Sequence, residues 1–111
     1  MTSSTIVEKI IAISPQQLQK RLSSGGVTLV DVRELSEYQQ AHIPGAILKP
    51  SSTLSDSDIQ QLLQWENLVL YCRSGRRSRQ VAEKLVSLGK QCVFDLQGGI
   101  IAWQEANLPV E

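Results

Sequence analysis

The sequence has few side chains that bind metals or form cross-links. It contains two cysteines, Cys72 and Cys92, and one histidine, His42, in 111 residues. A structural zinc site normally needs four Cys or His ligands, so we expect no metal site. Two cysteines do not make a disulfide framework either, because small disulfide-stabilised domains carry several pairs. These shortages predict a cytoplasmic protein with reduced thiols.

The sequence also lacks a long apolar segment and a net charge. No stretch approaches 18 uncharged apolar residues, and Glu8 and Lys9 interrupt the segment 1–13, which therefore does not resemble a signal peptide. The 11 basic and 11 acidic side chains cancel. We therefore expect neither a nucleic acid nor a membrane as a partner. The length predicts one domain over residues 1–111.

Short apolar runs alternate with amphipathic segments along the chain. The runs typical of β-strands cover residues 27–32, 46–48, 68–71 and 92–96. Segments with helical signals cover residues 16–22, 34–41, 55–63, 81–88 and, after a Gly-Gly turn, the residues up to 103. This alternation predicts an α/β fold, with a mostly parallel sheet covered by helices on both faces. Ligands of such sheets bind at the carboxyl ends of the strands, which makes the loops after residues 32 and 71 candidate sites.

The loop 72–79 follows the third predicted strand and precedes a predicted helix. It reads Cys-Arg-Ser-Gly-Arg-Arg-Ser-Arg and holds four of the six arginines of the chain. Cations at a helix amino terminus oppose the helix dipole by about 0.3–1 kcal/mol each, so stability alone does not explain them. Backbone N–H groups, the dipole and guanidinium groups together suit an anion. The loop therefore predicts an anion-binding site.

Cys72 opens this loop, and we predict that it is a nucleophile. A helix amino terminus and nearby cations stabilise a thiolate, whose unperturbed pKa is about 8.5. Lowering that pKa by about 2 units requires roughly 2.7 kcal/mol, which such surroundings supply. Cys92 begins its predicted strand whereas Cys72 follows the end of another, so they lie roughly 15 Å apart and cannot form a disulfide. We expect Cys92 in the core.

Three segments of the chain resemble the signatures of the rhodanese family. They are, in order, Leu29–Arg33 with Glu37-Tyr38 and His42–Ala46, then Val69–Gly75 with Arg77-Ser78, and finally Leu96–Gly99 with Ala102-Trp103 and Leu108–Val110. One position departs from the pattern, because Ala41 stands where the family usually has glycine. The resemblance covers nearly the whole chain and implies a sheet of about five mostly parallel strands.

The resemblance also implies a sulfurtransferase of the thiosulfate:cyanide type. The thiolate of Cys72 would attack the outer sulfur of thiosulfate or a similar small anionic donor, release sulfite and become a persulfide. The sulfur would then pass to cyanide, a thiol or a protein acceptor. The residues expected to bind the donor and persulfide are Arg73, Ser74, Gly75, Arg76 and Arg77. Those expected to support the loop are Asp31, Arg33 and Ser78. This chemistry implies no cofactor, no metal ion and no dedicated general base.

Other interpretations of the same residues stay open. Phosphatases and arsenate reductases of similar fold have a loop one residue longer, with arginine at the sixth position after the cysteine, where this chain has Ser78. A binding or regulatory module with little turnover, or a sulfur carrier for a partner protein, is the alternative from another class. A thiol protease pair of Cys72 with His42 lacks an evident Asn or Asp to orient it.

Overall fold

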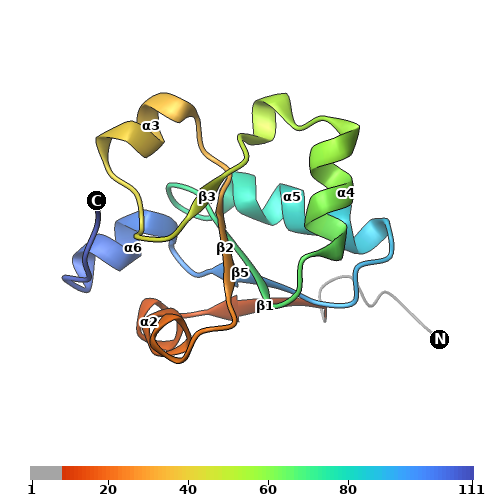
Figure 1. The fold of residues 1–111 in the computed structure, drawn as a ribbon. Helices are drawn as coiled ribbons and strands as arrows, with labels where there is room; N and C mark the ends of the chain where they lie inside the picture. Colours follow the sequence, from red (N-terminus) through yellow and green to blue (C-terminus); the bar gives the residue numbers. More distant parts are fainter. Residues whose placement is uncertain (1–8) are drawn as a thin grey trace.

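The computed structural model describes residues 9–111, and Figure 1 shows them as a central sheet between two layers of helices. Residues 1–8 lie outside the described part, so the expectation that residues 1–13 are not a signal peptide falls mostly on residues that the structure does not describe. The strands are β1 (Ile10–Ile13), β2 (Thr28–Asp31), β3 (Ile47–Leu48), β4 (Leu68–Tyr71) and β5 (Val93–Leu96). The helices are α2 (Pro15–Ser24), α3 (Leu35–Gln40), the 3-10 helix η1 (Ser51–Thr53), α4 (Asp56–Gln64), α5 (Arg76–Ser87) and α6 (Gly99–Glu105).

The five strands form one parallel sheet in the order β1-β5-β4-β2-β3. Strand β4 lies at the centre, and Asp31 of β2 pairs in register with Tyr71 at its carboxyl end. The predicted α/β class with a parallel sheet is therefore confirmed. The predicted strands do not include β1, although its sequence Ile-Ile-Ala-Ile is a short apolar run like those of the other strands; it pairs with β5 at the edge of the sheet.

Helices cover both faces of the sheet, as predicted. Helices α4 and α5 pack on one face, and α2 and α6 pack on the other (Figure 1). The first face buries a cluster that includes Val30, Leu70 and Leu85, and the second buries one that includes Leu18, Tyr71 and Trp103. The central strand is buried along its whole length, which explains its uninterrupted apolar sequence.

Local signals in the sequence set several helix boundaries. Ser14 and Ser55 cap α2 and α4, and each forms a reciprocal capping box with the third residue of its helix. The expectation that Cys92 belongs to the core is wrong: Cys92 is only half-buried, because it lies in the turn before β5 begins. No helix within residues 9–111 is long and apolar enough to cross a membrane.

Candidate active site

The sulfur of Cys72 lies among polar groups of the loop that follows it. Cys72 directly follows β4, and only 1% of the residue is exposed. The amide of Gly75 donates to its Sγ at 3.1 Å, and the amide of Ser78 donates at 3.4 Å. The hydroxyl oxygen of Ser78 lies 3.5 Å from the same sulfur. The loop therefore folds its own backbone around the thiol.

This surrounding favours the thiolate. Burial acts to raise the pKa of Cys72, because the charged form loses its hydration. Hydrogen bonds from the Ser78 hydroxyl and from the loop amides outweigh burial and bring the pKa of Cys72 below its ordinary value. The direction agrees with the prediction from the loop sequence, although the donors are mainly backbone groups and a hydroxyl.

Two glycines allow the loop to take this shape. Gly75 has φ of 112°, a left-handed conformation that turns its amide towards the sulfur before α5 begins. Gly99 lies against the loop backbone: a Cβ at this position would stand 2.3 Å from the carbonyl oxygen of Arg73 and 2.6 Å from that of Cys72. The amide of Ile100 consequently reaches the Cys72 carbonyl at 2.9 Å, and α6 supports the loop directly.

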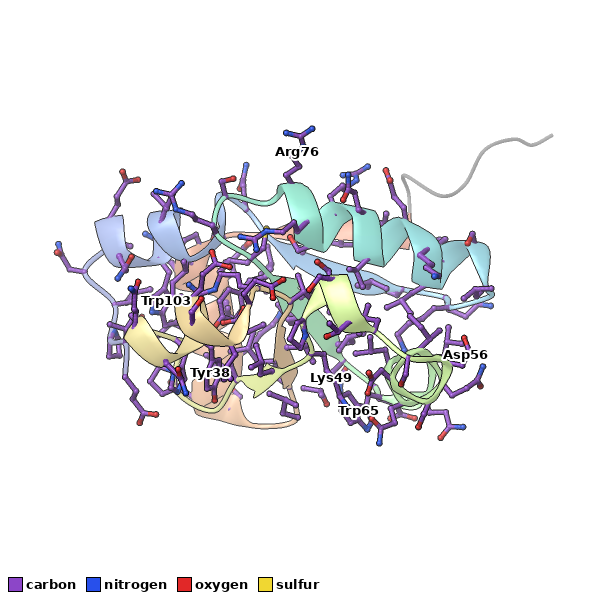
Figure 2. All side chains as sticks on the ribbon, turned by 90° about the horizontal axis from the view of Figure 1, so that it is seen from above. Tyr38, Lys49, Asp56, Trp65, Arg76 and Trp103 are labelled. Carbon is purple, nitrogen blue, oxygen red and sulfur yellow. The ribbon has the colours of Figure 1, made fainter. Side chains whose placement is uncertain are left out.

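The structure separates the four arginines of the loop. Arg73 lines a polar cavity of about 230 Å³ that also borders Ile100 and the α3 segment. Arg76 extends outward from the first turn of α5, away from the rest of the molecule (Figure 2). Arg77 forms a two-point ion pair with Glu37 of α3, at 2.8 and 3.0 Å. Ser74, also predicted to bind the donor, is exposed at the tip of the loop.

The Arg77–Glu37 pair ties α5 to α3. The hydrogen bond from Arg77 lowers the pKa of Glu37 to about 2, so the carboxylate is charged near neutral pH. Of the four loop arginines, Arg77 pairs with Glu37 and Arg79 with Glu83, whereas Arg73 lines the polar cavity, which Arg33 and Glu37 also line. The cationic loop is more divided in space than its sequence indicates.

Asp31 and Arg33 form a buried pair at the end of β2. Asp31 is fully buried, and its carboxylate accepts hydrogen bonds from the Arg33 guanidinium at 2.7 to 3.1 Å. The guanidinium also donates to the carbonyl of Ala41 at 2.7 Å and lies over the ring of Tyr71. The pair thus fixes β2 to the segment after α3 and to the residue that precedes Cys72.

His42 is held away from the thiol. Its ring stacks on Tyr38 at 3.8 Å, its Nδ1 lies 2.9 Å from the Tyr38 carbonyl, and its Nε2 faces Glu111. These contacts give it a structural role between α3 and the chain end. Within residues 9–111, no three His, Cys, Asp or Glu side chains gather closely enough to hold a metal ion.

Asp95 is a residue of the site that the sequence patterns do not single out. It lies on β5, and its Oδ1 accepts a hydrogen bond from the Ser78 hydroxyl at 2.6 Å. The sequence does contain one sign of this role: Asp95 is an acidic residue within a predicted strand, and acidic side chains are rarely buried without a hydrogen-bond partner.

Comparison with known proteins agrees with this geometry. A model of the rhodanese-like domain matches residues 14–106. A protein of Allochromatium vinosum named sulfurtransferase is 37% identical over 99 residues, which cover 88% of this chain and 92% of that protein. The crystal structure of a rhodanese-related protein from Thermoplasma volcanium matches with a TM-score of 0.78 at 29% identity, and the match covers 91% of this chain and 97% of that one. The chain belongs to the rhodanese-like domain family.

Relatives of this chain differ in length. An uncharacterized protein of Synechocystis is 38% identical over 109 residues, which make up 98% of this chain and 59% of that protein. The chain thus spans somewhat more than half of this relative and nearly all of the Allochromatium one. The domain therefore occurs both nearly alone and as part of a longer protein.

Proposed function

We propose that the protein is a sulfurtransferase that forms a persulfide on Cys72 from thiosulfate or a similar small anionic donor. The observation that carries the proposal is the pair of backbone amides, of Gly75 and Ser78, that donate to the sulfur, with the Ser78 hydroxyl oxygen 3.5 Å away. These donors stabilise negative charge on sulfur, which both the attacking thiolate and the resulting persulfide carry.

In the first step, the thiolate of Cys72 attacks the outer sulfur of the donor. A new S–S bond forms while the S–S bond of thiosulfate breaks, and sulfite leaves with the electron pair. We place the sulfonate group of the donor in the cavity of about 230 Å³ that Arg73 and Arg33 line together with Glu37, whose charge Arg77 neutralises. Only 1% of Cys72 is exposed, which favours a donor that presents one narrow sulfur atom.

In the second step, a nucleophile takes the outer sulfur and returns Cys72 to its thiolate. Cyanide yields thiocyanate, and a small thiol or the cysteine of a partner protein yields a new persulfide. No oxidant or reductant is consumed, since each step exchanges one S–S or S–C bond for another. A thiol-reducing compartment such as the cytoplasm suits this chemistry, because it keeps Cys72 free.

Two observations support sulfur transfer over the alternatives. The relative from Allochromatium vinosum that bears the name sulfurtransferase matches over nearly its full length. In the loop itself, Ser78 occupies the position where a phosphatase of similar fold has its phosphate-binding arginine, and its side chain points to the sulfur. A purely regulatory module needs neither the cysteine nor the amides that donate to its sulfur.

Mass spectrometry of the protein after incubation with thiosulfate tests the proposal. We expect the peptide that contains Cys72 to gain the mass of one sulfur atom and to lose it again when cyanide is added. Cys92→Ala is the matched control, and it should gain the same mass. A protein that gains no sulfur, or that gains it on Cys92, would overturn the proposal.

A further inference from the structure

A carboxylate lies behind the nucleophile on the sheet face that α5 covers. Asp95 sits on β5 between two other strands, and the residues beside it in register are Ala12 of β1 and Leu70 of β4. Val93, two residues earlier on the same face of β5, belongs to the apolar cluster beneath α5. The strand pattern therefore calls for an apolar side chain here, and the carboxylate needs another explanation.

Ser78 links this carboxylate to the thiol. The hydroxyl oxygen of Ser78 lies 2.6 Å from Oδ1 of Asp95 and 3.5 Å from the Sγ of Cys72, and the Ser78 side chain is fully buried. A hydroxyl has one proton to donate and can accept another. The thiol of Cys72 donates to this hydroxyl and the hydroxyl donates to Asp95, with the Gly75 carbonyl at 3.3 Å as a more distant second acceptor, so the three side chains form a relay.

We propose that Asp95 and Cys72 share one proton through the Ser78 hydroxyl, so that Asp95 is a positioning residue that sets the ionisation of the nucleophile. In the relay, the S–H bond of Cys72 breaks as its proton goes to the oxygen of Ser78. The hydroxyl proton of Ser78 goes at the same time to Oδ1 of Asp95. The products are a thiolate and a neutral carboxylic acid, with the same total charge as before.

The groups around the relay favour this exchange. Burial raises the pKa of Asp95, against the opposing effects of the Ser78 hydrogen bond and of the Arg79 charge. The pKa of Cys72 is lowered, so the two groups approach each other in proton affinity. Two arginines of α5 act on the pair: Arg79 on the acid, and Arg77, itself paired with Glu37 of α3, on the sulfur.

The relay has a consequence for an anionic donor. Without it, the thiolate and the Asp95 carboxylate would place two negative charges side by side in front of the incoming anion. With the proton on Asp95, the site carries one charge, and that charge is on the attacking atom. This consequence rests on the proposed function, whereas proton sharing itself does not.

Ultraviolet titration of the thiolate tests the relay in the Cys92→Ser protein, where Cys72 is the only thiol. We expect two titration steps, because coupled groups lose their protons in two macroscopic stages. Asp95→Asn should give a single step. Its midpoint should lie about one pH unit below the upper step of the parent protein, which means about tenfold more thiolate at a pH below that midpoint. Asp56→Asn, the same change at an exposed position on α4, should leave the two steps in place.

A double-mutant cycle shows whether the coupling passes through Ser78. In a Ser78→Ala background, Asp95→Asn should shift the midpoint by less than about a third of its effect in the parent protein. An equal shift in both backgrounds would mean that only the charge of Asp95 acts, and no shift in either would mean that the groups are independent. Both results would overturn the relay.

A measurement on Asp95 itself covers the case in which Asp95→Asn does not fold. Carbon NMR of the Asp95 carboxyl should show two steps in the parent protein and one in Cys72→Ala, displaced to lower pH. Because coupling between two sites is reciprocal, the shift of the Asp95 midpoint caused by Cys72→Ala should equal the shift of the Cys72 midpoint caused by Asp95→Asn. A carboxyl that titrates identically with and without the thiol contradicts the relay. Sulfur uptake, measured separately by mass, decides the proposed function whatever the titrations show.

Discussion

The two ends of the parallel sheet differ in what they offer a ligand. The amino end has the larger cavity, about 440 Å³, lined by Arg21, Gly25 and Asn67, and Cys92 lies in the turn before β5 at this end. The carboxyl end has a cavity of about 230 Å³ beside Arg73 and the loop of Cys72. Each end thus has a cavity, an arginine and a cysteine, yet hydrogen-bond donors converge on a sulfur at the carboxyl end.

The direction of the helices explains the difference. Parallel strands joined by helices bring helix amino termini to the carboxyl end of the sheet, and α5 begins there beside Cys72. At the amino end helices finish, as α2 does before Gly25, and they present carbonyl groups that repel anions. Cavity volume is therefore a poorer guide to the site than the direction of backbone groups. Substitutions at matched positions of the two ends test this comparison.

The two cysteines give the largest expected difference. Cys72→Ala should abolish sulfur transfer from thiosulfate to cyanide, because the persulfide then has no sulfur to form on. Cys92→Ala should keep most of the activity, since Cys92 lies at the other end of the sheet. Initial rates of thiocyanate formation measure both. An inactive Cys92→Ala and an active Cys72→Ala would reverse the assignment of the two ends.

Two glycines with positive φ give the next difference. Gly99→Ala should lower the free energy of unfolding by about 1–2 kcal/mol for its backbone conformation, and by about 1–3 kcal/mol more because its Cβ meets the loop backbone. Gly25→Ala, with φ of 83°, ψ of 176° and no atom within 4 Å of its added Cβ, should show a backbone cost alone, of about 1–3 kcal/mol.

Urea denaturation separates these two glycine contributions. Equal losses in both variants would mean that the loop of Cys72 does not depend on the close approach of α6. The sulfur transfer rate of Gly99→Ala, measured below its unfolding transition, should also fall, since the added Cβ displaces the backbone that carries Cys72.

A third test compares the arginines that line the two cavities. Arg73→Ala should raise the KM for thiosulfate about tenfold with little change in kcat, because a charge-assisted contact from this exposed side chain to the bound anion contributes about 1.5 kcal/mol, the lower end of its usual range. Arg21→Ala, at the larger cavity, should leave both constants unchanged. Arg76→Ala should have a smaller effect than Arg73→Ala, since its side chain points outward (Figure 2). An unchanged KM in Arg73→Ala would remove the anion-binding role of that cavity.

Much of the fold follows from local patterns in the sequence. Apolar strands and amphipathic helices predict the parallel sheet and its two helical layers, and serine caps set the starts of α2 and α4. Strand β1 is missing from the prediction although Ile10–Ile13 is an apolar run, because its place at the edge of the sheet depends on pairing with β5, more than eighty residues away. The four residues of β1 do not by themselves identify the strand with which they pair.

The site divides in the same way. The position of Cys72 between a strand and a helix predicts the amides that donate to its sulfur, because both neighbours are local. Three other features depend on distant contacts: the pairing of Arg77 with Glu37, the approach of Gly99 to the loop, and the contact of Asp95 with Ser78. Their residue types are visible in the sequence, whereas their partners follow only from the packing of α3, α6 and β5 around the loop.

The Arg77–Glu37 ion pair gives the smallest expected effect and depends on pH. Its hydrogen bond lowers the pKa of Glu37 from 4.5 to about 2 in the folded protein. The unfolded chain therefore binds a proton to Glu37 more readily, so the pair stabilises the fold above pH 4.5 and loses this effect as the pH falls towards 2. Because the pair is partly exposed, we expect Glu37→Gln to lower the free energy of unfolding by about 0.5–1 kcal/mol at pH 7.

Glu83→Gln provides the control, because Glu83 forms an exposed ion pair with Arg79 within α5. It should change the free energy of unfolding by about 0.3 kcal/mol or less at pH 7. Urea denaturation at several pH values then gives the difference between each variant and the parent, in which the other carboxyl groups cancel. For Glu37→Gln this difference should shrink as the pH falls below 4.5. If the difference in free energy of unfolding between Glu37→Gln and the parent stays constant down to pH 3, Glu37 contributes through packing. Arg77 would then be available to bind the anionic donor.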